Sequence, residues 1–67
     1  MGLKLSMLEE VRKFVAANFE SGSITTTEFP LLPGGVRVVD QIGEELLFYY
    51  DTLTEEVKWV EPERGNN

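Results

Sequence analysis

The chain has 67 residues, with 12 acidic and 6 basic side chains, a formal net charge of −6, and neither cysteine nor histidine. Without cysteine there can be no disulfide or thiolate metal site, and without histidine the commonest metal ligand and the commonest general base near neutral pH are missing. The acidic residues are spread along the whole chain and no basic stripe is present to neutralise phosphates, so direct nucleic-acid binding is not expected.

This length allows one domain with one hydrophobic core. The longest wholly apolar run covers residues 46–50, far short of the roughly 20 residues that span a bilayer. The N-terminal residues also lack the apolar stretch of a signal peptide. We therefore expect a cytoplasmic protein without membrane contact, with a single α+β domain over residues 1–61 and a disordered polar tail over residues 62–67.

The first predicted element is an amphipathic helix over residues 7–20. Apolar residues recur at spacings of three and four and form one stripe: Met7, Leu8, Val11, Phe14, Val15 and Phe19. Ser6 and Glu9 fit a capping box at the helix start, and Gly22 is well placed to end the helix in the left-handed conformation. Asn18 falls within the apolar stripe, and we expect it to bond backbone groups near the helix end.

After Gly22 the hydrophobic period changes from 3.6 to 2, which predicts strands over residues 24–29, 36–40, 44–51 and 57–61. Pro30 cannot donate to a β-ladder, so the first strand should lie at an edge or end there. Residues 32–35, Leu-Pro-Gly-Gly, have the sequence of a tight turn.

A second turn fixes the predicted register. Asp40 to Glu44 is typical of a type I turn closed by a glycine bulge, in which Gly43 takes the left-handed conformation and Asp40 accepts backbone hydrogen bonds. This turn places Val38 opposite Leu46 and, two residues on, Val36 opposite Phe48. The predicted fold is therefore α+β, with the N-terminal amphipathic helix packed on one face of a three- to four-stranded antiparallel β-meander.

The register assigns two faces to this sheet. The core face should carry Val36, Val38, Leu46, Phe48, Tyr50, Val57 and Trp59. The opposite face should carry Arg37, Val39, Glu45, Leu47, Tyr49, Asp51, Lys58 and Val60. This second face is more apolar than a solvated antiparallel face requires, which predicts an interaction surface formed by Arg37, Val39, Leu47, Tyr49, Lys58 and Val60. The alternative is that these side chains only support strand pairing.

No catalytic, cofactor-binding or metal-binding residues are predicted. The adjacent carboxylates Glu44 and Glu45 should point to opposite faces of a strand, as should Glu55 and Glu56, so neither pair converges on a substrate. A calcium loop over residues 51–56 would lack the usual ligand alternation and glycine.

Three classes of function stay open. The leading hypothesis is a small acidic, non-catalytic protein-interaction or regulatory module that binds a protein partner or forms a homodimer, with no small-molecule substrate evident. A second is an acidic inhibitor of the virus- or mobile-element type that mimics nucleic acid and occupies a basic cleft. It would need phosphate-like carboxylates on one surface, with candidates Glu28, Glu44, Glu45, Glu55, Glu56 and Glu61. A third, an enzyme or small-ligand carrier, would require a pocket that a chain of this size has little room for.

Overall fold

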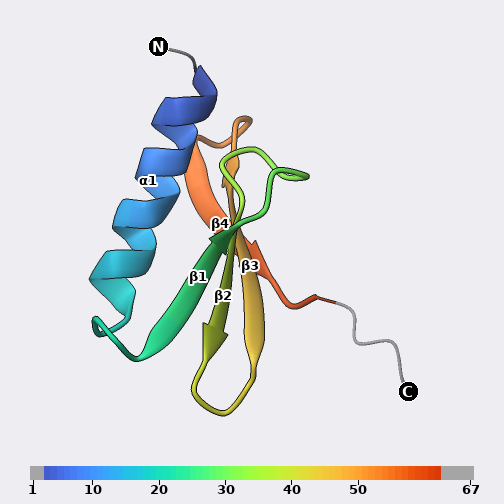
Figure 1. Cartoon of the computed structure of the whole chain (residues 1–67). Helices are drawn as coiled ribbons and strands as arrows, with labels where there is room; N and C mark the ends of the chain where they lie inside the picture. Colours follow the sequence, from blue (N-terminus) through green and yellow to red (C-terminus); the bar gives the residue numbers. More distant parts are fainter. Residues whose placement is uncertain (1–2, 63–67) are drawn as a thin grey trace.

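The computed structural model describes the backbone of residues 3–62 and the side chains of residues 6–62. It contains α1 (Leu3–Asn18), β1 (Ile24–Glu28), β2 (Val36–Asp40), β3 (Glu45–Asp51) and β4 (Glu56–Val60). The four strands form one antiparallel sheet in the order β1-β2-β3-β4, and α1 packs on one of its faces (Figure 1). The predicted α+β meander is confirmed. Apart from Pro62, the predicted tail lies outside the described residues.

The helix begins earlier than predicted. Because α1 starts at Leu3, Ser6 lies inside the helix, and the prediction of a start at residue 7 behind a capping box of Ser6 and Glu9 was wrong. Leucine and lysine are good helix formers, and no breaker lies between Leu3 and Ser6. At the other end, Asn18 Nδ2 donates to the carbonyl of Phe14 at 2.8 Å, as predicted. Gly22 follows in the left-handed conformation with φ of 88°.

The pairing of β2 with β3 has the predicted register, with Val36 opposite Phe48 and Val38 opposite Leu46. The connecting turn explains why this register is fixed. Asp40 Oδ1 accepts the backbone N–H groups of Ile42 at 3.0 Å and Glu44 at 2.9 Å. Gly43 supplies the left-handed residue with φ of 90°.

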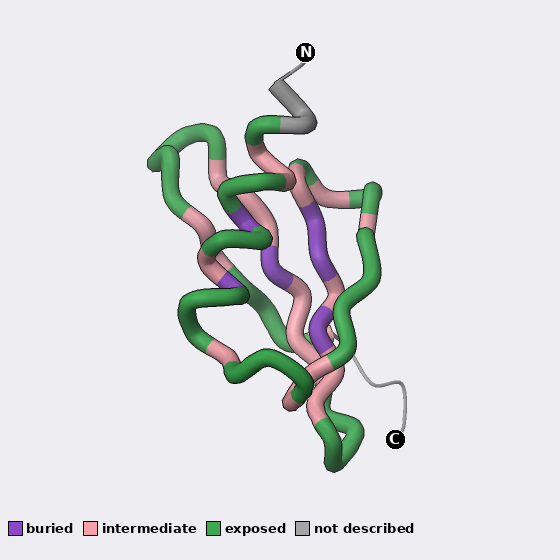
Figure 2. Tube along the Cα trace, turned by 60° about the vertical axis from the view of Figure 1, so that its left-hand side comes forward, coloured by how far each residue is buried: buried purple, intermediate pink, exposed green. Residues whose placement is uncertain are grey.

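The core lies between α1 and the two central strands. Its buried residues are Val11, Val15, Val36, Val38 and Phe48, and they fall on α1, β2 and β3 (Figure 2). The Phe48 ring lies within 6.0 Å of the ring centroids of Phe14, Phe19 and Trp59. Trp59 was predicted on this face and does contact Phe48, but it is 52% exposed. The reason is that β4 is an edge strand, whereas α1 packs mainly on β3.

The β1–β2 loop bonds to β3 and packs closely against α1, since a Cβ added to Gly34 would lie 2.8 Å from backbone atoms of Met7. Gly34 has φ of 58°, and Gly35 N–H donates to the carbonyl of Leu32 at 2.9 Å, which closes the predicted turn. The carbonyl oxygen of Pro33 accepts a hydrogen bond from the backbone N–H of Tyr50 in β3, at 2.9 Å.

Within residues 3–62, no helix is both long and apolar enough to cross a membrane.

Candidate interaction surface

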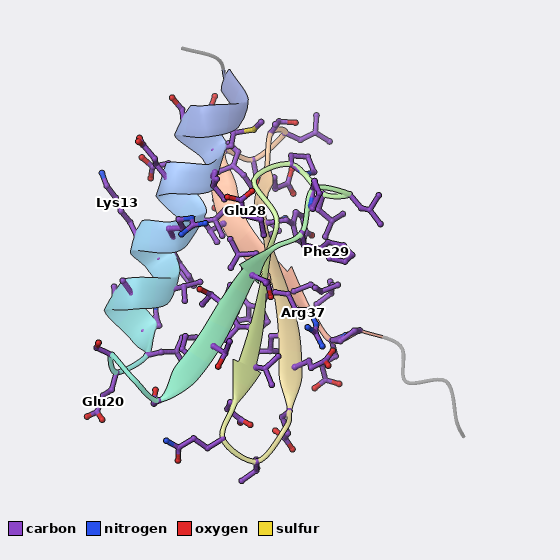
Figure 3. All side chains as sticks on the ribbon, viewed as in Figure 1. Lys13, Glu20, Glu28, Phe29 and Arg37 are labelled. Atoms are coloured by element: carbon purple, nitrogen blue, oxygen red, sulfur yellow. The ribbon has the colours of Figure 1, made fainter. Side chains whose placement is uncertain are left out.

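The sheet face turned away from α1, called the outer face below, carries every residue that was predicted for it. Side chains alternate along a strand. Since Val36, Val38 and Phe48 are buried in the core, their strand neighbours point the other way. Figure 3 shows Arg37 directed away from the helix. The outer face of the three strands β2–β4 comprises Arg37, Val39, Glu45, Leu47, Tyr49, Asp51, Glu56, Lys58 and Val60.

Leu47 lies at the centre of this face. It sits opposite Arg37 in β2 and opposite Val60 in β4, so both neighbouring strands flank it. Val60 is 45% exposed, and Leu47 is half-buried by its neighbours. Val39 is the diagonal neighbour of Leu47 on β2, and Tyr49 is its neighbour on the same face of β3. Both are close enough to Leu47 to extend one apolar area. The structure therefore brings the four apolar residues of the prediction together on three adjacent strands.

Two ion pairs lie beside this apolar area. Arg37 Nη2 pairs with Glu45 Oε2, and Lys58 Nζ pairs with Asp51 Oδ2 at 2.8 Å. The hydrogen bond from Lys58 and a second one from the Leu53 N–H hold the pKa of Asp51 below its usual value. The same carboxylate raises the pKa of Lys58. The outer face thus combines apolar side chains with two ion pairs that form within the chain.

Phe29 also belongs to the outer face, although sequence reasoning left it out. Its N–H donates to the Gly35 carbonyl at 2.9 Å, which continues the β1–β2 pairing beyond Glu28. The alternation that puts Thr25 and Thr27 on the outer face puts Phe29 there too, and Figure 3 shows it on the same side as Arg37. The spacing of residues 25, 27 and 29 was the available signal. The predicted first strand, residues 24–29, included Phe29, but faces were assigned only to the residues of the three later strands.

The carboxylates required by nucleic-acid mimicry do not share one surface. Glu28 in β1 pairs with Arg12 of α1 at 3.2 Å. Glu55 and Glu56 lie at the β3–β4 turn, at the opposite end of the sheet from the β2–β3 turn where Glu44 is found (Figure 1).

Several hollows flank the helix on the other face of the sheet. One of about 660 Å³ lies beyond the helix end, between Phe19 and Trp59, with Asp40, Glu44 and Glu61 at its rim. Another of about 470 Å³ is lined by Met7 and Leu8 of α1 and by residues of the β1–β2 loop. Among the described residues, no cluster of three or more acidic side chains could hold a metal ion. Neither of these two hollows contains a nucleophile activated by a neighbouring base.

No protein-family model, curated protein or solved structure matches the chain. The function of the outer face must therefore be inferred from its own geometry.

Proposed function

We propose that this protein is a small, non-catalytic interaction module that binds a partner protein through its outer face. The observation that carries the proposal is the uncovered apolar area around Leu47, which α1 leaves free because the helix packs on the opposite face. An apolar centre with a polar rim is the usual anatomy of a protein interface.

The ion pairs also favour binding. Burying an unpaired charge in an interface is costly, but the Arg37–Glu45 and Asp51–Lys58 pairs are each matched before a partner arrives. The partner best suited to this face offers an apolar patch of its own, flanked by polar groups that can bond to the rim. Tyr49 supplies a side chain of a type that is enriched at binding hot spots.

The test compares two identical substitutions. Leu47→Lys places a charge at the centre of the outer face, and Leu53→Lys makes the same change at a 93% exposed leucine in the β3–β4 turn. We expect native-lysate capture and subsequent titration with the purified partner to give wild-type binding for Leu53→Lys. For Leu47→Lys we expect at least a tenfold loss, equivalent to about 1.4 kcal/mol.

Circular dichroism and thermal unfolding establish that both variants are folded before binding is compared. A partner that binds wild type and the two variants with equal affinity would show that the outer face is not the binding surface. The nucleic-acid-mimic alternative gains no support from the distribution of carboxylates described above.

A further inference from the structure

One edge of the sheet has unpaired backbone groups that are open to solvent. Phe29 N–H bonds to the Gly35 carbonyl, and the antiparallel alternation then directs the backbone groups of Thr27 and Thr25 toward β2. The intervening residues Ile24, Thr26 and Glu28 direct their N–H and C=O groups away from the sheet. These groups form a row to which another strand can bond.

This edge lacks the usual protection. Thr25, Thr26, Thr27 and Glu28 are all exposed, on both faces of the sheet, and β1 forms a continuous exposed stretch beside the partly buried β2 (Figure 2). The helix lies over the other three strands but not over β1. Threonine favours extended backbone, and neither lysine nor proline interrupts residues 24–28.

The charge balance distinguishes β1 from the other edge. The single charged residue of β1, Glu28, is matched by Arg12 of the same chain at 3.2 Å. The segment at the β4 edge, residues 55–61, carries three glutamates and Lys58. Lysine and excess charge are common ways of blocking an edge strand. In a chain with a net charge of −6, two copies therefore repel each other less at the β1 edge than at the β4 edge.

We propose that β1 pairs with β1 of a second copy of this chain to form a two-fold symmetric dimer with one continuous eight-stranded sheet. The self-complementary register places Thr26 on the two-fold axis, opposite Thr26 of the partner subunit. Ile24 then lies opposite Glu28 of the partner subunit, and every outward-facing backbone group of β1 is used. The register provides about six backbone hydrogen bonds and puts no like charges opposite each other.

This interface differs from the outer face, and the inference does not depend on the proposed function. Five residues of strand edge bury little area, so we expect a dissociation constant on the order of 100 μM. Sedimentation velocity and light scattering over a concentration series should show the wild-type chain changing from monomer to dimer around that concentration.

Thr26→Pro is the first test, because this proline removes an outward N–H and no bond to β2. We expect it to be folded and monomeric at concentrations where wild type and the matched control Thr26→Val are dimeric. Leu47→Lys should leave the dimer intact. If wild type stays monomeric up to about 1 mM, or if Leu47→Lys abolishes the dimer and Thr26→Pro does not, the inference is wrong.

A cysteine pair tests the register even if the proline variant does not fold. The chain has no native cysteine, so each variant carries a single thiol. Cysteines replacing Thr26 would face each other across the axis with Cα atoms about 5.5 Å apart, within disulfide range. Cysteines replacing Glu28 would lie about 14 Å apart along the strands, beyond that range. Oxidation should link Thr26→Cys into a covalent dimer and leave Glu28→Cys unlinked, whereas equal linking of both would overturn the register.

Discussion

Phe48 and Tyr49 are neighbours on β3 whose side chains should contribute very differently to stability. Phe48 is 3% exposed and its ring contacts three aromatic rings at centroid distances between 5.7 and 6.0 Å. Truncation of such a phenylalanine to alanine costs about 3–5 kcal/mol. A domain of this length has a free energy of unfolding of about 3–10 kcal/mol. Phe48→Ala should therefore remove much or all of the stability.

Tyr49→Ala makes a change of similar size on the outer face. Tyr49 is half-buried and makes no ring contact within the part of the chain that the structure describes. We therefore expect Tyr49→Ala to lower the free energy of unfolding by less than about 1.5 kcal/mol. Urea unfolding followed by far-ultraviolet circular dichroism measures both losses, and fluorescence of the single tryptophan, Trp59, provides a second probe. If the two losses are equal, or if Tyr49→Ala costs more, the assignment of the two faces is refuted.

Two further predictions concern charge and backbone. Because the pKa of Asp51 is lowered in the folded state, its contribution to the free energy of unfolding is fully present above its ordinary pKa of 3.8. This contribution is lost as the pH falls through the pKa of the folded state. Because the pKa of Lys58 is raised in the folded state, its contribution to the free energy of unfolding is fully present below its ordinary pKa of 10.5. This contribution is lost as the pH rises through the pKa of the folded state. Urea unfolding across both ranges should show these losses in wild type and not in Asp51→Asn; identical profiles would contradict the pairing. A Cβ on Gly35 would lie 2.1 Å from the Phe29 carbonyl oxygen, so Gly35→Ala should cost about 3 kcal/mol. A Cβ on Gly43 would meet no atom within 4 Å, so Gly43→Ala is disfavoured only by the φ of 90° and should cost about 1 kcal/mol. Thermal melts in which Gly35→Ala is the milder change would contradict this ranking.

The sheet register could be predicted because a local signal determines it. Asp40 and Gly43 specify the turn between β2 and β3, and a two-residue alternation then carries the register along both strands. The two faces follow from the register, which is why the residues predicted for the outer face lie together. Their role in binding stays a prediction.

Features that depend on distant contacts could not be predicted in the same way. The capping box at Ser6 marks a plausible helix start, but residues 3–5 are themselves compatible with a helix, so the local pattern does not place the start at Leu3. The exposure of Trp59 depends on which strands α1 covers, and the hydrophobic period does not specify this position. The bond between Pro33 and Tyr50 joins segments far apart in the chain and has no local pattern.

The two proposed surfaces can act together because of the symmetry of the dimer. A two-fold axis through Thr26, perpendicular to the sheet, keeps both helices on one side and both outer faces on the other. Two binding areas centred on Leu47 would then be presented in the same direction by one rigid sheet. A partner with two matching sites would bind the dimer more tightly than the monomer by avidity, without any new contact. Thr26→Pro should weaken binding only to a partner that is itself bivalent, whereas Leu47→Lys should weaken binding to either kind. A Thr26→Pro variant that loses a monovalent partner would show that β1, and not the outer face alone, contacts that partner.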